Sequence, residues 1–302
     1  MCDDEQSNLS SVPNVRHPTS CLVAASLTST ASAADDPSEK NVAFLGPERA
    51  ETMDVYQPSA EWARPAPAVV WIHGGSWVKG DKADAREQNI GKNLSANGYV
   101  VFSINYRLTR EPGTSPWPQN LYDCKSAVRY VRKEAARFGI DPGQIAVSGG
   151  SAGGHLALLV GLTSGASNPM NRGGLYPEQS NAVRCIVDFY GVIRTSDPEW
   201  TQFFAGATHE ETTANLQAAA PTNHLAADAP PTLIVHGTAD EVVHVSHSQE
   251  LAEAMQRLGI EHQLLEIPGA PHTFHLQPAE MDLRPVVLEF LEKYLRKPLK
   301  NG

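Results

Sequence analysis

The sequence has 302 residues, of which 41% are hydrophobic and 19% charged, and its formal net charge is −10. This composition is typical of a globular protein. The excess of acidic residues argues against a nucleic acid or an anionic membrane surface as a partner, because both attract clustered Lys and Arg. No apolar run reaches the length of a membrane-spanning helix.

The four cysteines give no indication of a metal site, because none of them occurs in a C-x-x-C or similar ligand spacing. Cys124 and Cys185 lie in segments with an apolar pattern. We expect both to be buried free thiols, with a disulfide between them as the alternative.

Residues 1–40 differ from the rest and are expected to lie outside the folded domain, which we place at residues 41–299. A short apolar stretch, residues 21–27, follows Arg16 and His17 and precedes Ala31-Ser32-Ala33. A basic flank, a short hydrophobic region and an A-x-A pattern are typical of an export signal. The sequence therefore predicts a secreted or periplasmic protein, with a Ser/Ala-rich tail on a cytoplasmic protein as the alternative.

Strand-like apolar runs alternate with helical patterns along the remaining chain. The predicted strands are residues 42–44, 53–56, 68–72, 99–104, 144–148, 183–190, 231–236 and 262–267. The predicted helices are residues 81–97, 119–138, a run from 156, an Ala-rich piece ending at 220, 246–258 and 283–295. This alternation predicts an α/β fold with a mostly parallel central sheet and helices on both faces. Arg107, at a strand end, is expected to form an ion pair with Asp123.

The pattern weakens over residues 191–228, where Trp200, Phe203 and Phe204 cluster. We interpret this segment as a small insertion before the strand at 231–236. One interpretation is a partial lid over a ligand site. The alternative is that the aromatic side chains pin two short helices to the core.

A glycine-crowded turn at residues 149–155 joins a predicted strand to an apolar helix. Its G-x-S-x-G pattern places Ser151 at a sharp strand-to-helix turn, where the hydroxyl is exposed at the helix N-terminus. Gly149 and Gly153 allow strand and helix to pack closely around that serine. An ordinary turn can have the same short pattern, so the interpretation depends on partners elsewhere in the chain.

Such partners follow two later strands. Asp240 lies in a loop after the strand at 231–236, and His272 follows the last strand. In a parallel sheet both loops lie beyond the carboxyl ends of the strands, where Ser151 also lies. A histidine can take the proton of the serine hydroxyl, and an aspartate can orient the histidine. Glu241 and His275 are the less favoured alternatives for these two positions.

The run His73-Gly74-Gly75-Ser76-Trp77 follows the buried strand at 68–72. Glycines at such a strand end let backbone N–H groups approach a ligand closely. We expect the N–H groups of Gly75, Ser76 and Ala152 to form an oxyanion hole. The ring of His73 is expected to order this turn.

Trp77 and Trp117, both in loops, are predicted to line the substrate site, with packing over the edge of the core as the alternative. The other histidines considered are expected to be packing, capping or surface residues: His155, His236, His244 and His247.

Together these motifs resemble the esterase/lipase branch of the α/β-hydrolases, and most closely the BD-FAE-type enzymes, which are bifunctional acetylxylan and feruloyl esterases. The resemblance covers residues 41–298 and rests on H-G-G-S-W at 73–77, N-Y-R at 105–107, G-G-S-A-G-G-H at 149–155, H-G-T-A-D at 236–240 and P-G-A-P-H-T-F at 268–274. It implies a serine carboxylic-ester hydrolase with a triad of Ser151, Asp240 and His272 and no cofactor. The implied substrate is a small-molecule or polysaccharide ester, with an acetyl, other short-chain or aromatic acyl group.

Two positions depart from the hormone-sensitive-lipase pattern. Ser76 occupies the place where a third glycine is usual, and Gly150 that of an aspartate. Both favour the acetylxylan-esterase-like branch. The alternatives are an arylformamidase- or peptidase-like amide hydrolase and a catalytically silent binding protein of the same fold. A complete triad argues against the silent protein.

Overall fold

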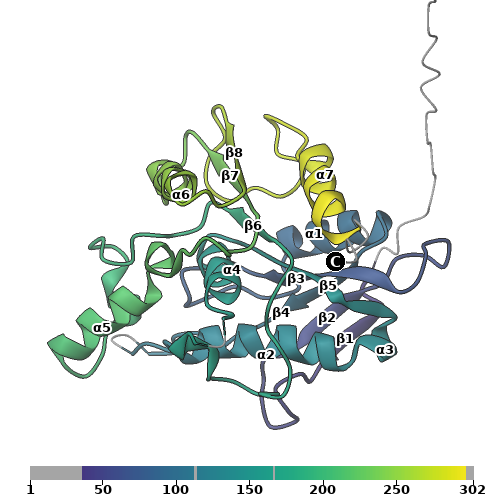
Figure 1. The fold of residues 1–302 in the computed structure, drawn as a ribbon, viewed down its shortest axis with the longest axis horizontal. Coiled ribbons are helices and arrows are strands. Elements are labelled where there is room, and N and C mark those ends of the chain that lie inside the picture. The colour runs from purple at the N-terminus through teal and green to yellow at the C-terminus, as the bar shows by residue number, and fades with distance from the viewer. Residues whose placement is uncertain (1–35, 112–113, 166, 297–302) are drawn as a thin grey trace, which may run out of the picture. The chain divides into compact units, whose positions relative to one another are not determined.

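The computed structural model describes residues 36–111, 114–165 and 167–296. Its sheet has eight strands in the order β1-β2-β4-β3-β5-β6-β7-β8 (Figure 1). Only β2 runs against its neighbours, so the predicted mostly parallel sheet is confirmed. The strands are β1 (Glu39–Val42), β2 (Met53–Tyr56), β3 (Ala66–Ile72), β4 (Val100–Ile104), β5 (Ile140–Gly150), β6 (Ile186–Phe189), β7 (Thr232–Gly237) and β8 (His262–Ile267).

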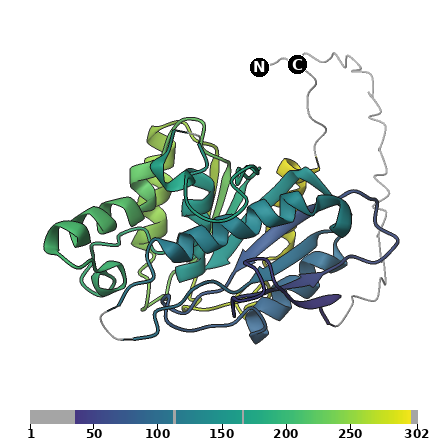
Figure 2. The same ribbon diagram turned by 90° about the horizontal axis from the view of Figure 1, so that it is seen from below.

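Helices cover both faces of this sheet, as predicted (Figures 1 and 2). One face packs against α2, α4 and α6, and the other against α1 and α7. The α-helices are α1 (Ala85–Ala96), α2 (Gln119–Lys133), α3 (Ala135–Phe138), α4 (Ala152–Leu162), α5 (His209–Ala219), α6 (Ser246–Arg257) and α7 (Arg284–Leu295). The single helix expected at 119–138 is divided at Glu134 into α2 and α3.

The central elements are apolar on every side. All residues of β4 are buried, and β3 has only one residue that is not fully buried. Such continuous apolar runs suit strands of a parallel sheet that is covered on both faces. Helix α4 is also buried along its whole length, so the chain after Ser151 is enclosed by protein.

Strand pairing brings the loops of interest to one edge of the sheet. Strand β5 lies between β3 and β6, with Gly149 opposite both Ile72 and Asp188. Strands β7 and β8 continue the parallel order. Because these strands run in the same direction, the segments that follow β3, β5, β7 and β8 all emerge at their carboxyl ends.

Helix α5 and the short 3-10 helices η2 (Thr201–Phe204) and η3 (Pro221–His224) lie between β6 and β7. They form the small insertion that was predicted before the strand leading to Asp240. No helix in the described part of the chain is long and apolar enough to cross a membrane.

The domain start predicted at residue 41 falls within β1. The predicted export signal lies outside the described residues. At the start of the described chain, the N–H of Ser38 bonds to the carbonyl of Val55, so pairing begins ahead of residue 41.

Two smaller expectations are confirmed. Cys124 and Cys185 are buried free thiols, as expected. Arg107 pairs with Asp123 as predicted, through its backbone N–H at 3.1 Å and its guanidinium at 3.5 Å. Arg49, which the prediction did not include, bonds to the same carboxylate at 3.0 Å.

Candidate active site

Ser151 lies at a strained turn between β5 and α4. Its φ of 58° and ψ of −122° are unusual for a residue with a side chain. Its N–H bonds to the carbonyl of Phe189 at 2.8 Å, which fixes the turn to β6. Gly153 is required next to it, because a Cβ there would overlap the carbonyl of Ile72. The side chain of Ser151 is therefore held at the carboxyl end of β5 with 7% of its residue surface exposed.

The structure brings Ser151, His272 and Asp240 together. His272 Nε2 lies 3.1 Å from Ser151 Oγ, and His272 Nδ1 lies 2.6 Å from Asp240 Oδ2. A carboxylate accepts hydrogen bonds, so Nδ1 of His272 carries the proton. Nε2 then has a free lone pair that faces the serine hydroxyl. This is the arrangement in which a histidine can act as a base toward a serine.

Asp240 accepts three hydrogen bonds and has a second histidine ring close to it. The N–H groups of Val242 and Val243 bond to Oδ1 at 2.9 and 2.8 Å. Oδ2 receives His272 and, at 3.2 Å, Nε2 of His236. Burial alone would raise the pKa of Asp240, but the hydrogen bonds from the two histidines outweigh it and keep the pKa well below its usual range.

His236 was expected to be a surface or packing residue, and the surface alternative is wrong because its side chain is fully buried on β7. Its contact with Asp240 was not predicted. The only hint of this contact in the sequence was the H-G-T-A-D motif, in which His236 and Asp240 are four positions apart.

The alternative base and acid lie elsewhere. His275 Nδ1 accepts a hydrogen bond from the N–H of Gln277 at 2.9 Å, and Glu241 is exposed. Neither side chain contacts Ser151 or Asp240 through a hydrogen bond or ion pair within the described residues.

The glycine turn after β3 lies directly against the elbow. A Cβ on Gly74 would lie 3.2 Å from the Cβ of Ser151. Gly75 has a φ of +112°, and Ser76 and Trp77 follow at 53° and 59°. This left-handed run turns the backbone sharply. Among the described residues, the N–H groups of Gly75 and Ser76 have no hydrogen-bond acceptor.

The N–H of Ala152 belongs to the first turn of α4, where helical N–H groups lack intrahelical acceptors. It lies next to Ser151 at the positive end of the helix dipole. Together with Gly75 and Ser76 it stays a predicted oxyanion donor.

The ring of His73 is engaged with its own loop, in line with its predicted ordering role. Its Nδ1 donates to the carbonyl of Gly74 at 2.7 Å, and its ring stacks on Tyr106 at 4.5 Å. The hydroxyl of Tyr106 bonds to the carbonyl of His73 at 3.0 Å. Burial lowers the pKa of His73 to about 4, so the ring is neutral at pH 7.

Trp77 and Trp117 lie in an aromatic cluster beneath the turn rather than on its surface. They are only 1% and 7% exposed. Both indole rings contact Phe204, at centroid distances of 5.1 and 5.5 Å, and Trp77 contacts His155 at 5.1 Å. The structure thus gives both side chains a packing role, and their contact with substrate stays a prediction.

The same cluster supports the packing interpretation of the insertion, while its role as a partial lid stays a prediction. Trp200 and Phe203 also contact Trp77, at centroid distances of 6.1 and 5.4 Å. His155 adds a hydrogen bond from its Nε2 to the carbonyl of Ala219, at 2.8 Å. The insertion is therefore pinned to the core by aromatic packing, which was the second alternative.

Tyr190 and Arg86 form a support behind the site that sequence reasoning missed. The Tyr190 ring meets the His272 ring edge-on at 4.8 Å. Its hydroxyl donates to the carbonyl of Phe274 at 2.9 Å and accepts from Arg86 at 3.3 Å. Tyr190 has a positive φ of 44°, a property that no short sequence pattern announces.

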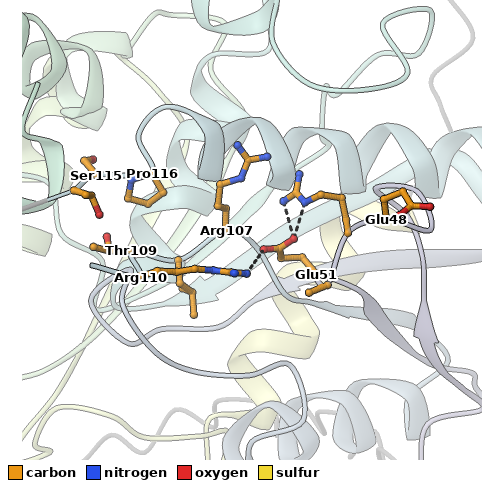
Figure 3. Close-up of a pocket in the computed structure, with 11 residues that line it drawn as sticks. Glu48, Glu51, Arg107, Thr109, Arg110, Ser115 and Pro116 are labelled. Carbon is orange, nitrogen blue, oxygen red and sulfur yellow. Dashed lines mark hydrogen bonds and ion pairs between the residues drawn. The ribbon is translucent and has the colours of Figure 1, made fainter. Parts of the chain in front are cut away.

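Two hollows lie near these loops. A pocket of about 340 Å³ adjoins the turn and the histidine loop, and its lining is Gly74, Gly75, Lys79, Gly80, Asp84, Arg86, Glu87 and Thr273. A second pocket of about 440 Å³ is lined in part by the residues labelled in Figure 3. There Glu51 pairs with Arg49 at 2.7 Å and with Arg110 at 3.8 Å, so these charges are neutralised within the protein. The lining of the first pocket includes Gly74, which lies against Ser151, and Thr273, which follows His272, but neither Ser151 nor His272 itself.

Asp188, at the end of β6, is a buried carboxyl group beside the elbow. Neither of its oxygens has a hydrogen-bond partner among the described side chains and backbone groups. Burial raises its pKa to about 7, while the nearby His236 acts in the opposite direction.

The described residues contain no group of three or more His, Cys, Asp or Glu side chains suited to hold a metal ion.

Comparison with known protein families and curated proteins gives consistent matches. The sequence matches the family model BD-FAE over residues 53–255, which include Ser151 and Asp240 and end before His272. Esterase LipC of Mycobacterium tuberculosis is 31% identical over 244 residues, covering 77% of this chain and 59% of that protein. The probable carboxylic ester hydrolase LipM of the same organism is 30% identical over 240 residues, covering 76% and 54%. The chain thus spans little more than half the length of these curated relatives.

Solved structures give the same result for the fold. The truncated form of a carbohydrate esterase from gut microbiota superposes with a TM-score of 0.76 and 26% identity, covering 88% of this chain and 99% of that one. Thermogutta terrifontis esterase 2 phosphorylated by paraoxon superposes with a TM-score of 0.66 and 28% identity, covering 82% and 91%.

Proposed function

Because the chain belongs to the BD-FAE family and has the α/β-hydrolase fold, we propose that it is a serine carboxylesterase that removes acetyl or feruloyl groups from plant polysaccharide. The observation that carries this proposal is the hydrogen-bonded line from Ser151 through His272 to Asp240 at the strained turn. A protein that only binds ligands has no need to maintain such a line. The predicted export signal would place the enzyme outside the cytoplasm, where polymeric substrates occur.

In this proposal Ser151 is the nucleophile. Its Oγ attacks the ester carbonyl carbon while His272 Nε2 takes the hydroxyl proton. The tetrahedral intermediate then breaks its bond to the alcohol oxygen, which leaves with the proton from His272. Water attacks the acyl-enzyme in the same way, with His272 again as base, and releases the acid. Asp240 stabilises the imidazolium that forms in each step.

The pocket of about 340 Å³ beside the turn at Gly74 and Gly75 would give room for a substrate of limited size next to the reacting centre. It is at the small end of the range for small-molecule pockets. Four charged residues, Lys79, Asp84, Arg86 and Glu87, belong to its lining and could bond to the hydroxyl groups of a carbohydrate. The likeness to a carbohydrate esterase supports the same class of substrate.

The proposal predicts that acetate and ferulate are released from acetylated, feruloylated xylan by the parent protein and not by Ser151→Ala. Product release measured by chromatography checks this. Paraoxon, which phosphorylates Thermogutta terrifontis esterase 2, is expected to add a phosphoryl group to the peptide that contains Ser151. Mass spectrometry of the parent and of Ser151→Ala would locate that group.

These measurements separate the parts of the proposal. If Ser151 is phosphorylated but no acid is released from xylan, Ser151 is still the nucleophile, but the proposal that the substrate is a polysaccharide is wrong. Faster cleavage of an anilide than of an ester with the same acyl group would favour the amide hydrolase. Turnover of p-nitrophenyl acetate that persists in Ser151→Ala would overturn the serine mechanism.

Gly75→Ala is expected to lower kcat by roughly 10²- to 10³-fold, with a much smaller change in KM. The substitution adds a Cβ that overlaps the carbonyl of Lys79, at a φ of +112° that alanine rarely adopts. The N–H groups of Gly75 and Ser76 would therefore move. Gly46→Ala is the matched control, because Gly46 also has a positive φ but has no atom near the added Cβ. A loss in kcat that is equal in both variants would contradict the oxyanion role of this turn.

A further inference from the structure

Two histidine rings, rather than one, face the same oxygen of Asp240. His272 Nδ1 lies 2.6 Å and His236 Nε2 lies 3.2 Å from Oδ2. We propose that His236 is a positioning residue, which fixes the Asp240 carboxylate and limits the negative charge that it presents to His272. This inference rests on the proposed esterase mechanism, in which Asp240 acts on His272.

The partners of His236 define its protonation. Nε2 lies 2.7 Å from the carbonyl of Val243, which can only accept a hydrogen bond, so Nε2 carries the proton. Nδ1 lies 2.6 Å from Ser248 Oγ and accepts the hydroxyl proton. The N–H at Nε2 therefore bonds to Val243 and lies 3.2 Å from Asp240 Oδ2 at the same time. Ser248 maintains this tautomer from the opposite side of the ring.

This network is enclosed by protein. His236 and Ser248 have no exposed surface, and Asp240 is 3% exposed. Oδ1 of Asp240 accepts from two backbone N–H groups, and Oδ2 accepts from His272 and faces Nε2 of His236. Loss of the His236 donor would leave part of a buried charge without a partner.

The second donor should affect the reaction through His272. Protonated His272 is stabilised by its attraction to Asp240. A competing N–H at the same oxygen reduces the charge available for that attraction. Without His236, Asp240 attracts the proton-bearing His272 more strongly, and the acidic limb of kcat/KM moves to higher pH. The Asp240 carboxylate also becomes less well oriented, so kcat falls.

Other titratable groups face this network and define the controls. Asp188 on β6 lies near His236, and burial raises its pKa to about 7. His247 on α6 is also near, and burial lowers its pKa to about 4. Tyr190 contacts the rings of both His236 and His272, and burial raises its pKa. Of these, Asp188 titrates where an acidic limb would lie, so Asp188→Asn must be measured alongside.

The test is the pH profile of kcat/KM for p-nitrophenyl acetate, normalised to active sites titrated with paraoxon. His236→Phe is expected to lower kcat by roughly 10- to 100-fold and to move the acidic limb up by about half a pH unit or more. His247→Phe removes a histidine of similar burial that contacts Asp197 instead. It is expected to lose stability without moving the limb. Asp188→Asn in the His236→Phe background should leave the shift in place.

Conservative variants complete the test. His236→Gln keeps an N–H near the position of Nε2 and should recover most of the activity and of the parent pH profile. Ser248→Ala, a smaller change, should move the limb in the same direction by less. If His236→Phe does not fold, Ser248→Ala decides by the same readouts. An unmoved limb in His236→Phe, or in Ser248→Ala where His236→Phe does not fold, would overturn the proposal, as would equal shifts in His236→Phe and His247→Phe. Absence of Ser151-dependent turnover in the parent protein would instead overturn the proposed function itself.

Discussion

Replacing His272 by alanine is expected to lower kcat by roughly 10⁴- to 10⁶-fold, whereas replacing His275 should change it by less than about threefold. His272 is the ring that lies 3.1 Å from Ser151 Oγ. Without it the hydroxyl has no base, since Ser151 has no other hydrogen-bond partner for Oγ in the described part of the chain. His275 is occupied by the N–H of Gln277.

The two variants form a matched pair, because both remove an imidazole from the same loop. The measurement is kcat for p-nitrophenyl acetate, with the melting temperature recorded to separate folding from chemistry. Phosphorylation by paraoxon should slow in His272→Ala for the same reason, since the serine is then not activated. Equal losses in the two variants at equal stability would mean that His272 is not the base.

The sequence carried enough information to place Ser151, Asp240 and His272 together because each follows a different buried strand. Apolar runs with helices between them predict parallel strands, and parallel strands expose their carboxyl ends at one edge. The strand order β5-β6-β7-β8 then brings the three loops close. Only the residue type and the strand assignment were needed, and both are local properties of the sequence.

The burial of Trp77 and the contact of His236 with Asp240 could not be obtained in this way. Trp77 is enclosed by Phe204, which lies on the insertion far along the chain, so its environment depends on how that insertion packs. His236 occupies an ordinary inward position of a strand, where apolar packing and a polar role give the same pattern. Its role becomes visible only with Ser248 of α6 beside it. Contacts between distant segments have no local signature in a single sequence.

Acid is expected to unfold this protein as the pH falls from about 6.5 toward 4, because three histidines are buried in neutral form. Burial lowers the pKa values of His73, His155 and His247 to about 4, from the usual 6.5. Between these values the unfolded chain binds more protons than the folded chain, so the free energy of unfolding falls as the pH falls. Protonation of each histidine would lower the free energy of unfolding by up to about 3 kcal/mol at pH 4. Typical domains have a total stability of about 5–15 kcal/mol.

Asp188 acts in the opposite direction and provides the internal test. Its pKa is raised from 3.8 to about 7, so the folded chain binds the extra proton, and the stability associated with it is lost as the pH rises toward 7 and above. Asp188→Asn should therefore stabilise the protein by about 3–4 kcal/mol more at pH 8 than at pH 4. The stability of this variant should also fall more steeply in acid than that of the parent. His247→Phe should make that loss shallower. Urea unfolding at intervals from pH 4 to pH 8 measures the stability of the parent and of both variants. If the stability of the parent does not change between pH 6.5 and 4.5, the buried histidines are not neutral as assigned.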